Sequence, residues 1–336
     1  MISDKDRESF LEIIRPPTDF KLTYCLGTTF SLELPCLVQM AINSNGTKSE
    51  LDEISVIEGF NLIEDFSSKT CIFTQNCRIK SLPEELLKAG ESKKGRFFCL
   101  LDAMVEEVPT LSHYSSFHPK VWFLRFDLKE SDGPPVFKFL TMSRNLTSSL
   151  KWDISSCQIG TPKKDSYNSE LISFFKTIHR KSSLKGRKNK VLSNAILDLK
   201  NIEFDLPQGK HLKNYEFSYH WGAHKPWTPI EYSSYERLVV VSPFLSDAQL
   251  QKLDKHPDVI LITSNSDMVK IAPYEKLSKN TYIMDSNDMG LHAKIYFGRT
   301  DSYSDIVMGS ANCTNAAWVG DNVEAIVKYQ GPKSAT

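Results

Sequence analysis

The hydrophobic pattern of the first half of the chain alternates between strand-like and helix-like segments. Apolar, β-branched and aromatic runs of strand type occupy residues 22–34, 69–79, 96–108, 117–128 and 136–143. Between them, residues 35–42 and 83–90 have the composition of helices, and the turn residues around 129–135 separate the last two runs. This order predicts an α/β fold.

The second half repeats the same order. Residues 237–253 predict a strand, a turn and a helix, and residues 258–265 predict a buried strand. Apolar runs at 291–299, 305–318 and 323–329 follow. We interpret this as an internal duplication of units of roughly 150 residues, because a solenoid would need a repeat of about 20 to 50 residues.

Each half carries the same polar residues at matching places. The two sets are His118, Lys120, Ser143 and Asn145 in the first half and His292, Lys294, Ser310 and Asn312 in the second. Side chains two positions apart on a strand share a face, so each histidine is predicted to lie beside its lysine, with Ala293 and Ile295 facing the core. Gly309 would let the backbone turn or approach a ligand closely. One His-x-Lys pair alone suggests an ordinary histidine, but two copies, each followed by Ser-x-Asn, favour a function.

Two imidazoles, brought together across a pseudo-two-fold interface, would form one site that cleaves a phosphate ester. One imidazole can attack phosphorus and form a phosphohistidine, while the other protonates the leaving oxygen and later activates water. The lysines and the asparagine amides can bind the non-bridging oxygens. The two imidazoles must then differ in protonation, so their surroundings must separate their pKa values. This chemistry needs no metal or other cofactor.

The segments "HPK" with "SRNLTSS" and "HAK" with "GSANCTNAAW" resemble the motifs of the phospholipase D superfamily, and the resemblance extends from about residue 21 to 329. It implies an α/β fold of two similar lobes, each a mixed β-sheet flanked by helices, related by a pseudo-two-fold axis, with a metal-independent phosphodiesterase site between them. It also implies that His118 is the nucleophile and His292 the general acid and base. The phosphate-binding residues implied are Lys120, Lys294, Asn145 and Asn312, supported by Ser143 and Ser310.

Other positions match the family less closely. Glu324 lies where the family often places an acid that holds a catalytic imidazole, although an edge-strand surface charge would look the same. Its counterpart in the first half would be near Asp153 or Ser155, where the match is poor. Arg125 and Arg299 replace an aspartate that many members carry, which weakens a lipase assignment. These arginines either face substrate phosphate or are solvated surface residues, and the second motif looks like the tyrosyl-DNA phosphodiesterase form.

The predicted domains are an N-terminal lobe (1–178), a basic and aromatic linker or crossover (179–235) and a C-terminal lobe (236–336). The linker begins with a cluster without acids, whose cations are Arg180, Lys181, Lys185, Arg187, Lys188 and Lys190. It is either a solvated connection or an arm that contacts phosphates. The aromatic segment 215–227 is either packed against both lobes or forms a base-stacking surface.

Composition and charge indicate where the protein is located more clearly than they indicate its activity. The 336 residues include 41 Lys and Arg against 41 Asp and Glu, so net charge argues neither for nor against nucleic acid. The N-terminus lacks the apolar core of a secretory signal, and no run approaches about 18 apolar residues, which predicts a cytoplasmic protein without a membrane contact. The seven cysteines are scattered, mostly in apolar runs, and are predicted to be buried free thiols.

These features together predict a nuclease, most simply a bacterial DNA nuclease of restriction or anti-phage type. DNA is favoured over lipid because no basic amphipathic helix of the interfacial kind is present. A tyrosyl-DNA phosphodiesterase-like end-processing enzyme, a phospholipase D-type lipid hydrolase and a catalytically silent nucleic-acid-binding scaffold are the alternatives. The expected partners are nucleic acid and an ATPase or helicase subunit, with this chain as the nuclease part of a longer or multi-subunit system. A homo-oligomer is allowed but not needed, because both half-sites lie in one chain.

Overall fold

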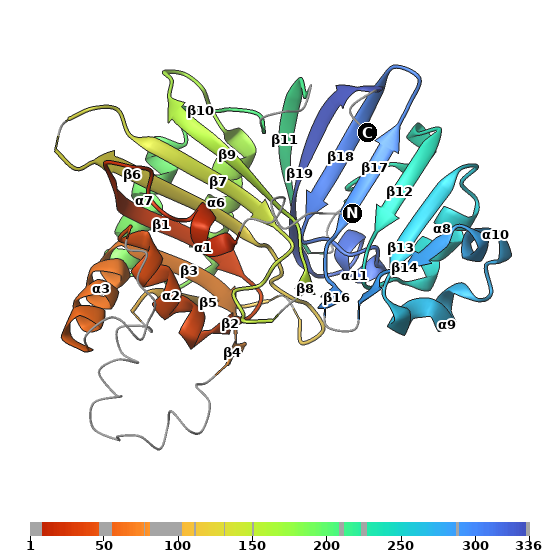
Figure 1. The fold of residues 1–336 in the computed structure, drawn as a ribbon, viewed down its shortest axis with the longest axis horizontal. Helices are drawn as coiled ribbons and strands as arrows, with labels where there is room; N and C mark the ends of the chain where they lie inside the picture. The colour runs from red at the N-terminus through yellow and green to blue at the C-terminus, as the bar shows by residue number, and fades with distance from the viewer. Residues whose placement is uncertain are drawn as a thin grey trace.

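The computed structural model describes residues 9–46, 56–76, 78–80, 103–110, 112–130, 132–149, 151–207, 212–222, 227–286 and 289–333. Within these residues the chain forms two α/β lobes that lie side by side (Figure 1). The predicted helix at 83–90 lies outside the described residues, as do residues 223–226 of the aromatic segment.

The first lobe is built on a mixed seven-stranded sheet in the order β10-β9-β7-β6-β1-β3-β5. Its strands are β1 (Phe20–Thr29), β3 (Thr70–Gln75), β5 (Val105–Val108), β6 (Val121–Leu128), β7 (Val136–Met142), β9 (Ser155–Pro162) and β10 (Ile202–Phe204). The strands β1, β3 and β5 are parallel, and the other neighbours are antiparallel. Nearly continuous apolar runs form these strands because helices cover both faces.

Two groups of helices cover the first sheet. On one face lie α1 (Phe10–Ile13), α2 (Leu34–Ser44) and α3 (Val56–Lys69), which pack with Trp122 and Leu124 in one core. On the other face lie α6 (Ser169–Lys181) and α7 (Gly186–Asp198), which pack with Phe123 and Phe139. The alternation along β6 therefore sends successive buried side chains into two different cores.

The second lobe repeats this sheet strand for strand, in the order β11-β19-β18-β17-β12-β13-β14. Its strands are β11 (Asn214–Trp221), β12 (Arg237–Val241), β13 (Val259–Thr263), β14 (Thr281–Ile283), β17 (Ile295–Arg299), β18 (Tyr303–Gly309) and β19 (Val323–Pro332). Parallel and antiparallel pairs occur in the same places as in the first sheet. The predicted fold class, an α/β protein of two similar lobes with mixed sheets, is confirmed.

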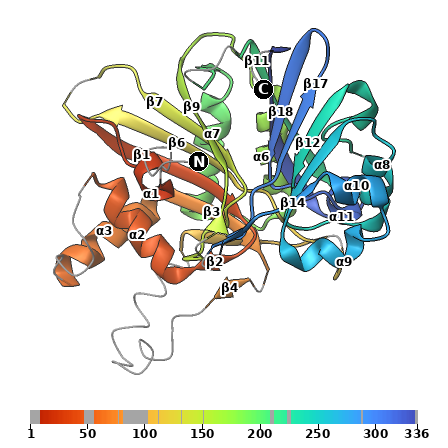
Figure 2. The ribbon, with the colours of Figure 1, turned by 45° about the vertical axis from the view of Figure 1, so that its right-hand side comes forward.

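The outer face of the second sheet carries its own helices, as Figure 2 shows. They are α8 (Asp247–Asp254), α9 (Met268–Ile271), α10 (Glu275–Lys279) and α11 (Asn315–Trp318), with the 3-10 turns η3 (Tyr232–Ser234) and η4 (Asn265–Asp267). The other face packs against first-lobe residues such as Ile154 and Leu206. The lobes thus share buried surface, and Val323 and Ala325 of β19 belong to the same core as α6 and α7.

Short strands connect the lobes at the edge where both sheets end (Figure 1). The first-lobe strand β8 (Lys151–Trp152) pairs in parallel with the second-lobe strand β16 (Met289–Leu291), which also pairs with β15 (Asp285–Ser286). Phe117 forms a parallel bridge with Val323 across the same junction. Within the first lobe, β2 (Leu32–Glu33) pairs with β4 (Ile79–Lys80). Backbone pairing therefore fixes the lobes against each other beside the two histidine motifs.

The stretch predicted as a linker, residues 179–235, contributes to both lobes. It includes the end of α6, all of α7 and β10 in the first lobe, and β11, which extends the second sheet beside β19. The aromatic residues Phe217 and Tyr219 of β11 pack against Phe174 of α6. The described part of the aromatic segment is thus packed between the lobes.

Two simpler expectations concern cysteines and membranes. The described cysteines, Cys25, Cys36, Cys71, Cys157 and Cys313, are free, and three of them are buried; Cys77 and Cys99 lie outside the described residues. None of the helices in the described ranges combines the length and apolar character needed to span a bilayer.

Candidate active site

Both histidine motifs lie in the irregular segments that lead into equivalent strands. His118 and Lys120 precede β6, and His292 and Lys294 precede β17. The prediction that each pair lies on a strand is wrong by a few residues, because the backbone N–H of each histidine binds across the lobe junction and not along its own sheet. The N–H of His118 donates to the carbonyl of Val323 at 3.0 Å, and that of His292 donates to the carbonyl of Trp152 at 2.8 Å.

Each imidazole is held by a carboxylate from the opposite lobe. The Nδ1 atom of His118 lies 2.9 Å from Oε2 of Glu324, on β19. The Nδ1 atom of His292 lies 2.6 Å from Oδ1 of Asp153, which follows β8. Since an ionised carboxylate only accepts hydrogen bonds, each neutral ring carries its proton on Nδ1 and presents the Nε2 lone pair.

Glu324 is therefore a site residue and not an edge-strand surface charge, because its side chain is fully buried and β19 lies between β18 and β11. Asp153 is its counterpart in the first lobe. The sequence match was poor because Asp153 follows Asn145 by eight residues, whereas Glu324 follows Asn312 by twelve. The four extra residues accommodate α11 in the second lobe.

The two serines of the motifs support these carboxylates. The hydroxyl of Ser143 donates to Asp153 at 2.7 Å, and the hydroxyl of Ser310 donates to Glu324. Each hydroxyl also accepts a backbone N–H, from Ile154 at 2.9 Å and from Ala325 at 3.0 Å. The serines thus fix the carboxylates at the lobe junction.

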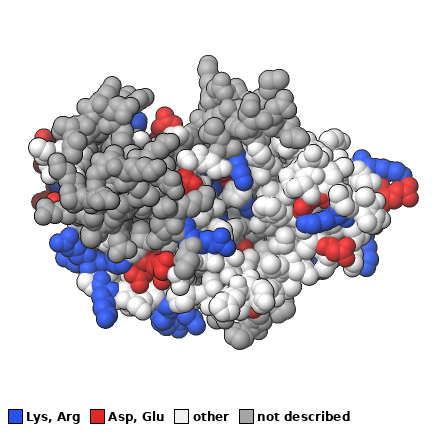
Figure 3. Space-filling view, turned by 90° about the horizontal axis from the view of Figure 1, so that it is seen from below, with Lys and Arg blue, Asp and Glu red and all other residues white. Residues whose placement is uncertain are grey.

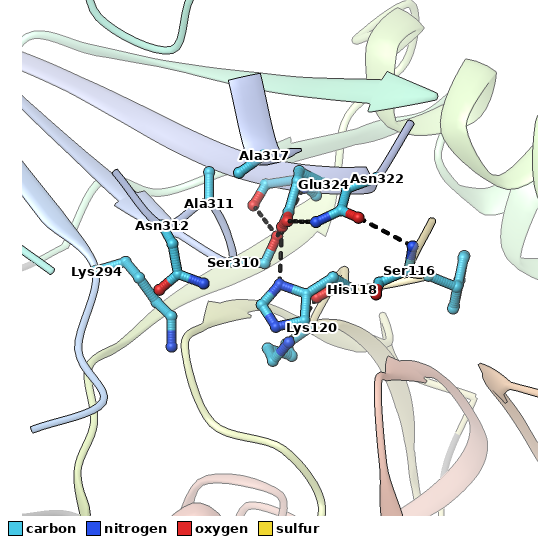
Figure 4. Close-up of polar contacts among 12 residues, drawn as sticks. Ser116, His118, Lys120, Lys294, Ser310, Ala311, Asn312, Ala317, Asn322 and Glu324 are labelled. Atoms are coloured by element: carbon cyan, nitrogen blue, oxygen red, sulfur yellow. Dashed lines mark hydrogen bonds and ion pairs between the residues drawn. The ribbon is translucent and has the colours of Figure 1, made fainter. Parts of the chain in front are cut away.

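Asn322 provides a further contact that the sequence did not suggest. Its amide nitrogen donates to Oε1 of Glu324 at 3.3 Å, and its amide oxygen accepts the backbone N–H of Ser116 at 2.9 Å (Figure 4). The hydrogen bonds link Glu324 to the segment that carries His118. Both oxygens of Glu324 are therefore engaged, which restricts the carboxylate to one orientation.

The two motif lysines are buried without a counter-ion in contact. Lys120 and Lys294 are both 0% exposed, and each Nζ donates to the carbonyl of its own histidine at 2.6 Å. Among the described residues no carboxylate lies within ion-pair distance of either ammonium. Buried ammonium groups are costly unless an anion accompanies them, so the arrangement is typical of an anion-binding site.

The asparagines complete this picture. Asn145 and Asn312 are half-buried, but the Oδ1 atom of each is buried and has no hydrogen-bond partner among the described residues. Buried polar atoms without a partner are rare in folded proteins, and they often mark a place where a ligand binds. Figure 4 shows Asn312 and Lys294 of the second lobe beside His118 and Lys120 of the first.

Electrostatic coupling shows that the two half-sites form one site. Burial lowers the pKa of His118, and it lowers the pKa of His292 to about 4; Glu324 and Asp153 oppose these shifts. Lys294 contributes to the lowered pKa of His118, and Lys120 contributes to that of His292. A bound anion would raise the pKa of every one of these groups.

The lysines themselves are affected in the same way. Burial lowers the pKa of Lys120 to about 7, although Glu324 and Asp153 oppose the shift. The pKa of Lys294 lies well below its ordinary value, through burial and the nearby charge of Lys120. For Asp153, burial raises the pKa, but the hydrogen bond and charge of His292 outweigh it and lower the pKa overall. Binding an anion here is therefore coupled to proton uptake.

Arg125 and Arg299 do not take part in this site. The guanidinium of Arg125 pairs with Asp127 at 2.9 Å and with Asp198 of α7 at 3.0 Å. Arg299 is five residues beyond Lys294, at the far end of β17, which corresponds to ~17 Å along a strand. Arg125 stands at the same distance from Lys120. Strand length thus carries both arginines away from the histidines, and their predicted contact with substrate phosphate stays a prediction.

The basic cluster predicted to bind substrate lies on the ends of α6 and α7. Lys188 pairs with Glu106 at 2.7 Å, and Arg180 donates to the hydroxyl of Thr177 at 3.0 Å. The other members, Lys181, Lys185, Arg187 and Lys190, are exposed. These residues lie on the helical layer behind the first sheet (Figure 2), and their predicted contact with substrate stays a prediction.

A pocket of about 140 Å³ opens beside His292. It is lined by Ser31, Arg144, Asn145, Thr147, Ser149, Lys151, Asp153 and His292. The sequence did not single out Arg144 or Lys151, although Arg144 stands between Ser143 and Asn145 of the motif. The face of the molecule in Figure 3 shows Lys and Arg side chains near its centre, between the two lobes.

On the other side of the site, Phe30 contacts His118. The two rings meet edge to face, with centroids 5.4 Å apart. The Phe30 ring also lies under Arg78 and Lys120. Among the described residues no group of three or more His, Cys, Asp and Glu side chains is placed to hold a metal ion.

Comparison with known proteins gives little beyond the fold. No family model matches the chain, and no curated protein matches it. One solved structure that matches is the polyphosphate kinase from Porphyromonas gingivalis, at 10% sequence identity and a TM-score of 0.42. The match covers 94% of this chain and 41% of that enzyme, so the chain spans less than half of it. A likeness this distant carries no argument about activity.

The predicted family membership is therefore corrected. Assignment to the phospholipase D superfamily, in its nuclease or tyrosyl-DNA phosphodiesterase-like branch, is wrong, since neither a family model nor a curated protein matches the chain. The short motifs that suggested the assignment are nevertheless brought together in space. What the chain does must be judged from that geometry, which contains the groups needed for phosphoryl transfer through a histidine.

Proposed function

We propose that this protein is a phosphodiesterase that hydrolyses nucleic acid through a phosphohistidine intermediate. One observation carries the proposal: two imidazoles from opposite lobes each have Nδ1 bound to a carboxylate of the other lobe. Both Nε2 atoms are thereby available to one substrate, beside two buried lysines and two asparagines with unpaired amide oxygens. This set matches what transfer of a phosphodiester to a histidine requires.

In the first step Nε2 of one imidazole attacks phosphorus and forms an N–P bond. The bond from phosphorus to the leaving oxygen breaks, and that oxygen takes a proton from Nε2 of the second imidazole, which must be protonated. The carboxylate on Nδ1 of the attacking ring stabilises the positive charge that develops there. Lys120, Lys294 and the amides of Asn145 and Asn312 bind the non-bridging oxygens.

In the second step water replaces the histidine. The second imidazole, now neutral, takes a proton from a water molecule, whose oxygen attacks phosphorus while the N–P bond breaks. The products are an alcohol and a phosphomonoester, and both imidazoles return to their starting states. No group in this sequence needs to come from outside the site except the water.

The roles of the two histidines follow the sequence expectation, with His118 as nucleophile and His292 as acid and base. Glu324, which holds His118, is the more deeply buried carboxylate and has both oxygens engaged. A low-dielectric environment strengthens its stabilisation of a cationic phosphohistidine. For His292, the pKa of about 4 must rise when substrate binds, which the charge of the phosphodiester favours.

A polyanionic substrate fits the surroundings of the site better than a lipid does. Arg144 and Lys151 lie beside His292, and further exposed cations lie on α6 and α7. Successive phosphates of a nucleic acid strand can use such separated cations, whereas a phospholipid headgroup presents a single diester. We propose DNA as the first substrate to test. The expected ATPase or helicase partner and the role in anti-phage defence stay predictions.

The test incubates the purified protein with plasmid, single-stranded DNA, RNA and phospholipid vesicles, each with and without excess EDTA. We expect cleavage of nucleic acid that EDTA does not abolish and that His118→Ala and His292→Ala each remove. Activity that survives both substitutions, or that EDTA abolishes, would exclude the mechanism. Cleavage of phospholipid alone would exclude the substrate class.

A second experiment assigns the histidines. Nitrophenolate is a leaving group that does not need a proton, so a variant lacking only the acid should still form the phosphoenzyme from a nitrophenyl ester. If His118 attacks, His292→Asn accumulates phosphoprotein with this substrate and His118→Asn does not. Acid quench followed by mass spectrometry of the peptide distinguishes this result from the reverse one.

A further inference from the structure

The two lobes place the same catalytic groups around the site, but they differ next to them. The strand registers show which residues of the two lobes are equivalent. Gly27 pairs with Trp122, two residues after Lys120, and Val240 pairs with Tyr296, two residues after Lys294. Gly27 therefore corresponds to Val240. Counting from Ser143 and Ser310, and from Asp153 and Glu324, gives further equivalent positions. The differing pairs are Ser31 with Phe244, Arg144 with Ala311, Ser149 with Ala316 and Lys151 with Asn322.

On the first-lobe side these residues line the pocket beside His292, and they make it polar and cationic. The guanidinium of Arg144 is oriented by a hydrogen bond to the carbonyl of Thr147 at 2.9 Å, and it lies 3.9 Å from Asp153. Lys151 is exposed, and the pairing of β8 with β16 sets it opposite Gly290, two residues before His292. Two cations therefore stand beside one catalytic imidazole.

On the second-lobe side the equivalent positions are uncharged. Phe244 replaces Ser31 and is 48% exposed, and Ala311 replaces Arg144. Asn322 replaces Lys151, and its amide is already bound to Glu324 and to the backbone of Ser116. The second-lobe positions equivalent to the cationic pocket therefore offer an exposed aromatic side chain and no cation. An approximately symmetric site is thus flanked by two chemically different surfaces.

We propose that the pocket of Arg144 and Lys151 binds the phosphate adjacent, along the nucleic-acid strand, to the phosphodiester being cleaved. This inference rests on the proposed function and names a substrate-binding site for it. His292 and Asn145 line both the pocket and the catalytic centre, so the two phosphates would lie next to each other. A planar guanidinium and an exposed ammonium are the donors that phosphate prefers in proteins.

The consequence is that a strand binds in one direction. A pseudo-symmetric pair of histidines alone would accept a symmetric diester in either orientation, and each histidine could then act as nucleophile. A cationic phosphate site beside His292, where the equivalent second-lobe positions are uncharged, breaks this equivalence. The neighbouring phosphate then determines which oxygen of the scissile group faces His292 and leaves with its proton.

The experiment compares substrates with and without the second phosphate. The dinucleotide thymidylyl-(3′→5′)-thymidine is measured alone, with an additional phosphate on its free 5′-hydroxyl and with one on its free 3′-hydroxyl, each by chromatography of the products. For one of the two positions, we expect the additional phosphate to lower KM in the wild type. Arg144→Ala and Lys151→Asn, which install the second-lobe residues, should each raise that KM about tenfold, which corresponds to the loss of one charge-assisted hydrogen bond. The KM of the dinucleotide without an additional phosphate should change by less than about twofold.

The control is Lys164→Asn, which removes an exposed lysine far from the junction and should change neither substrate. Equal loss on both substrates would show that Arg144 acts only by orienting Asp153, and it would overturn the proposal. No loss on either substrate would overturn it as well.

If the wild type cleaves none of these esters, the proposed function fails. Whether the pocket binds a phosphate is then tested by a binding measurement. Calorimetric titration with thymidine 3′,5′-bisphosphate should show binding to the wild type that weakens about tenfold in Arg144→Ala and Lys151→Asn. Absent binding, or binding that the substitutions leave unchanged, would contradict the pocket assignment.

Discussion

The contact between Glu324 and His118 gives the sharpest test of the proposed chemistry. Glu324→Gln keeps the shape of the side chain and removes its charge. The amide oxygen can still accept from Nδ1 of His118, so the ring can keep its tautomer and its orientation. What changes is the stabilisation of the positive charge that His118 gains when it attacks phosphorus.

The size of the effect can be worked out from the geometry. Nδ1 and Oε2 are 2.9 Å apart, and the charge of an imidazolium is spread over its ring, so the centres of charge are ~4 Å apart. At an effective dielectric constant of ~20 this corresponds to about 4 kcal/mol. Loss of that stabilisation in the transition state slows the step about a thousandfold. Because ground-state binding of the diester does not involve this charge pair directly, KM should change much less than kcat.

The assay follows release of 4-nitrophenolate from bis(4-nitrophenyl) phosphate in single-turnover conditions, at a pH where His118 is neutral. Circular dichroism at the assay temperature checks that the variant is folded. The matched control is Asp321→Asn, which removes a carboxylate three residues away that contacts only Ser112 among the hydrogen bonds described here. We expect the control to retain activity within about threefold.

The reasoning would be refuted by a Glu324→Gln enzyme that is folded and retains its single-turnover rate within about threefold. That result would mean that no positive charge develops on His118. A comparable loss in Asp321→Asn would instead point to disruption of the loop, and it would remove the electrostatic interpretation of both variants.

Three further predictions concern protonation and packing. Because the pKa of His292 falls from 6.5 to about 4 on folding, the unfolded chain binds more protons between these pH values. The unfolding free energy, measured by urea titration, should therefore fall by about 3 kcal/mol as the pH is lowered from 6.5 to 4. His292→Gln should lack this decrease. Since the pKa of Lys120 is about 7, calorimetry should show sulfate binding that weakens as the pH rises through 7, and Lys120→Gln should lose this dependence. A Cβ at Gly309, where φ is +152°, would collide with the carbonyl of Ala325; Gly309→Ala should lower the unfolding free energy by about 2 kcal/mol, whereas Gly290→Ala, which meets open space, should change it by less than about 0.5 kcal/mol.

The repeat of segments along the chain was enough to predict the fold class. Apolar runs of strand length, separated by turn residues and helix-like segments, occur in the same order twice, and burial on both faces of each sheet requires such runs. The duplication also predicted which polar residues of the two halves would lie together. His118, His292 and their lysines and asparagines lie together because equivalent positions of two similar lobes meet at one junction.

Positions that depend on spacing within a lobe were harder to predict. Arg125 and Arg299 are close to the histidines in sequence, but the extended backbone carries Arg125 into the middle of β6 and Arg299 to the far end of β17. The partner of His292 was obscured by a difference in loop length, since α11 lengthens one of the two connections. Gly309 was expected to let the backbone turn or approach a ligand closely, and the structure shows that it makes room for the backbone of β19.

The sequence by itself predicted the α/β fold class, the duplication and the polar residues that meet at the junction, because these depend on residue types and on periodicity along the chain. Only the tertiary structure decided that each carboxylate serves the histidine of the other lobe, since this pairing arises from backbone contacts between Phe117 and Val323 and between β8 and β16. The same contacts decided which side of the site carries Arg144 and Lys151. Those relations join residues more than 100 positions apart, and no local pattern encodes them.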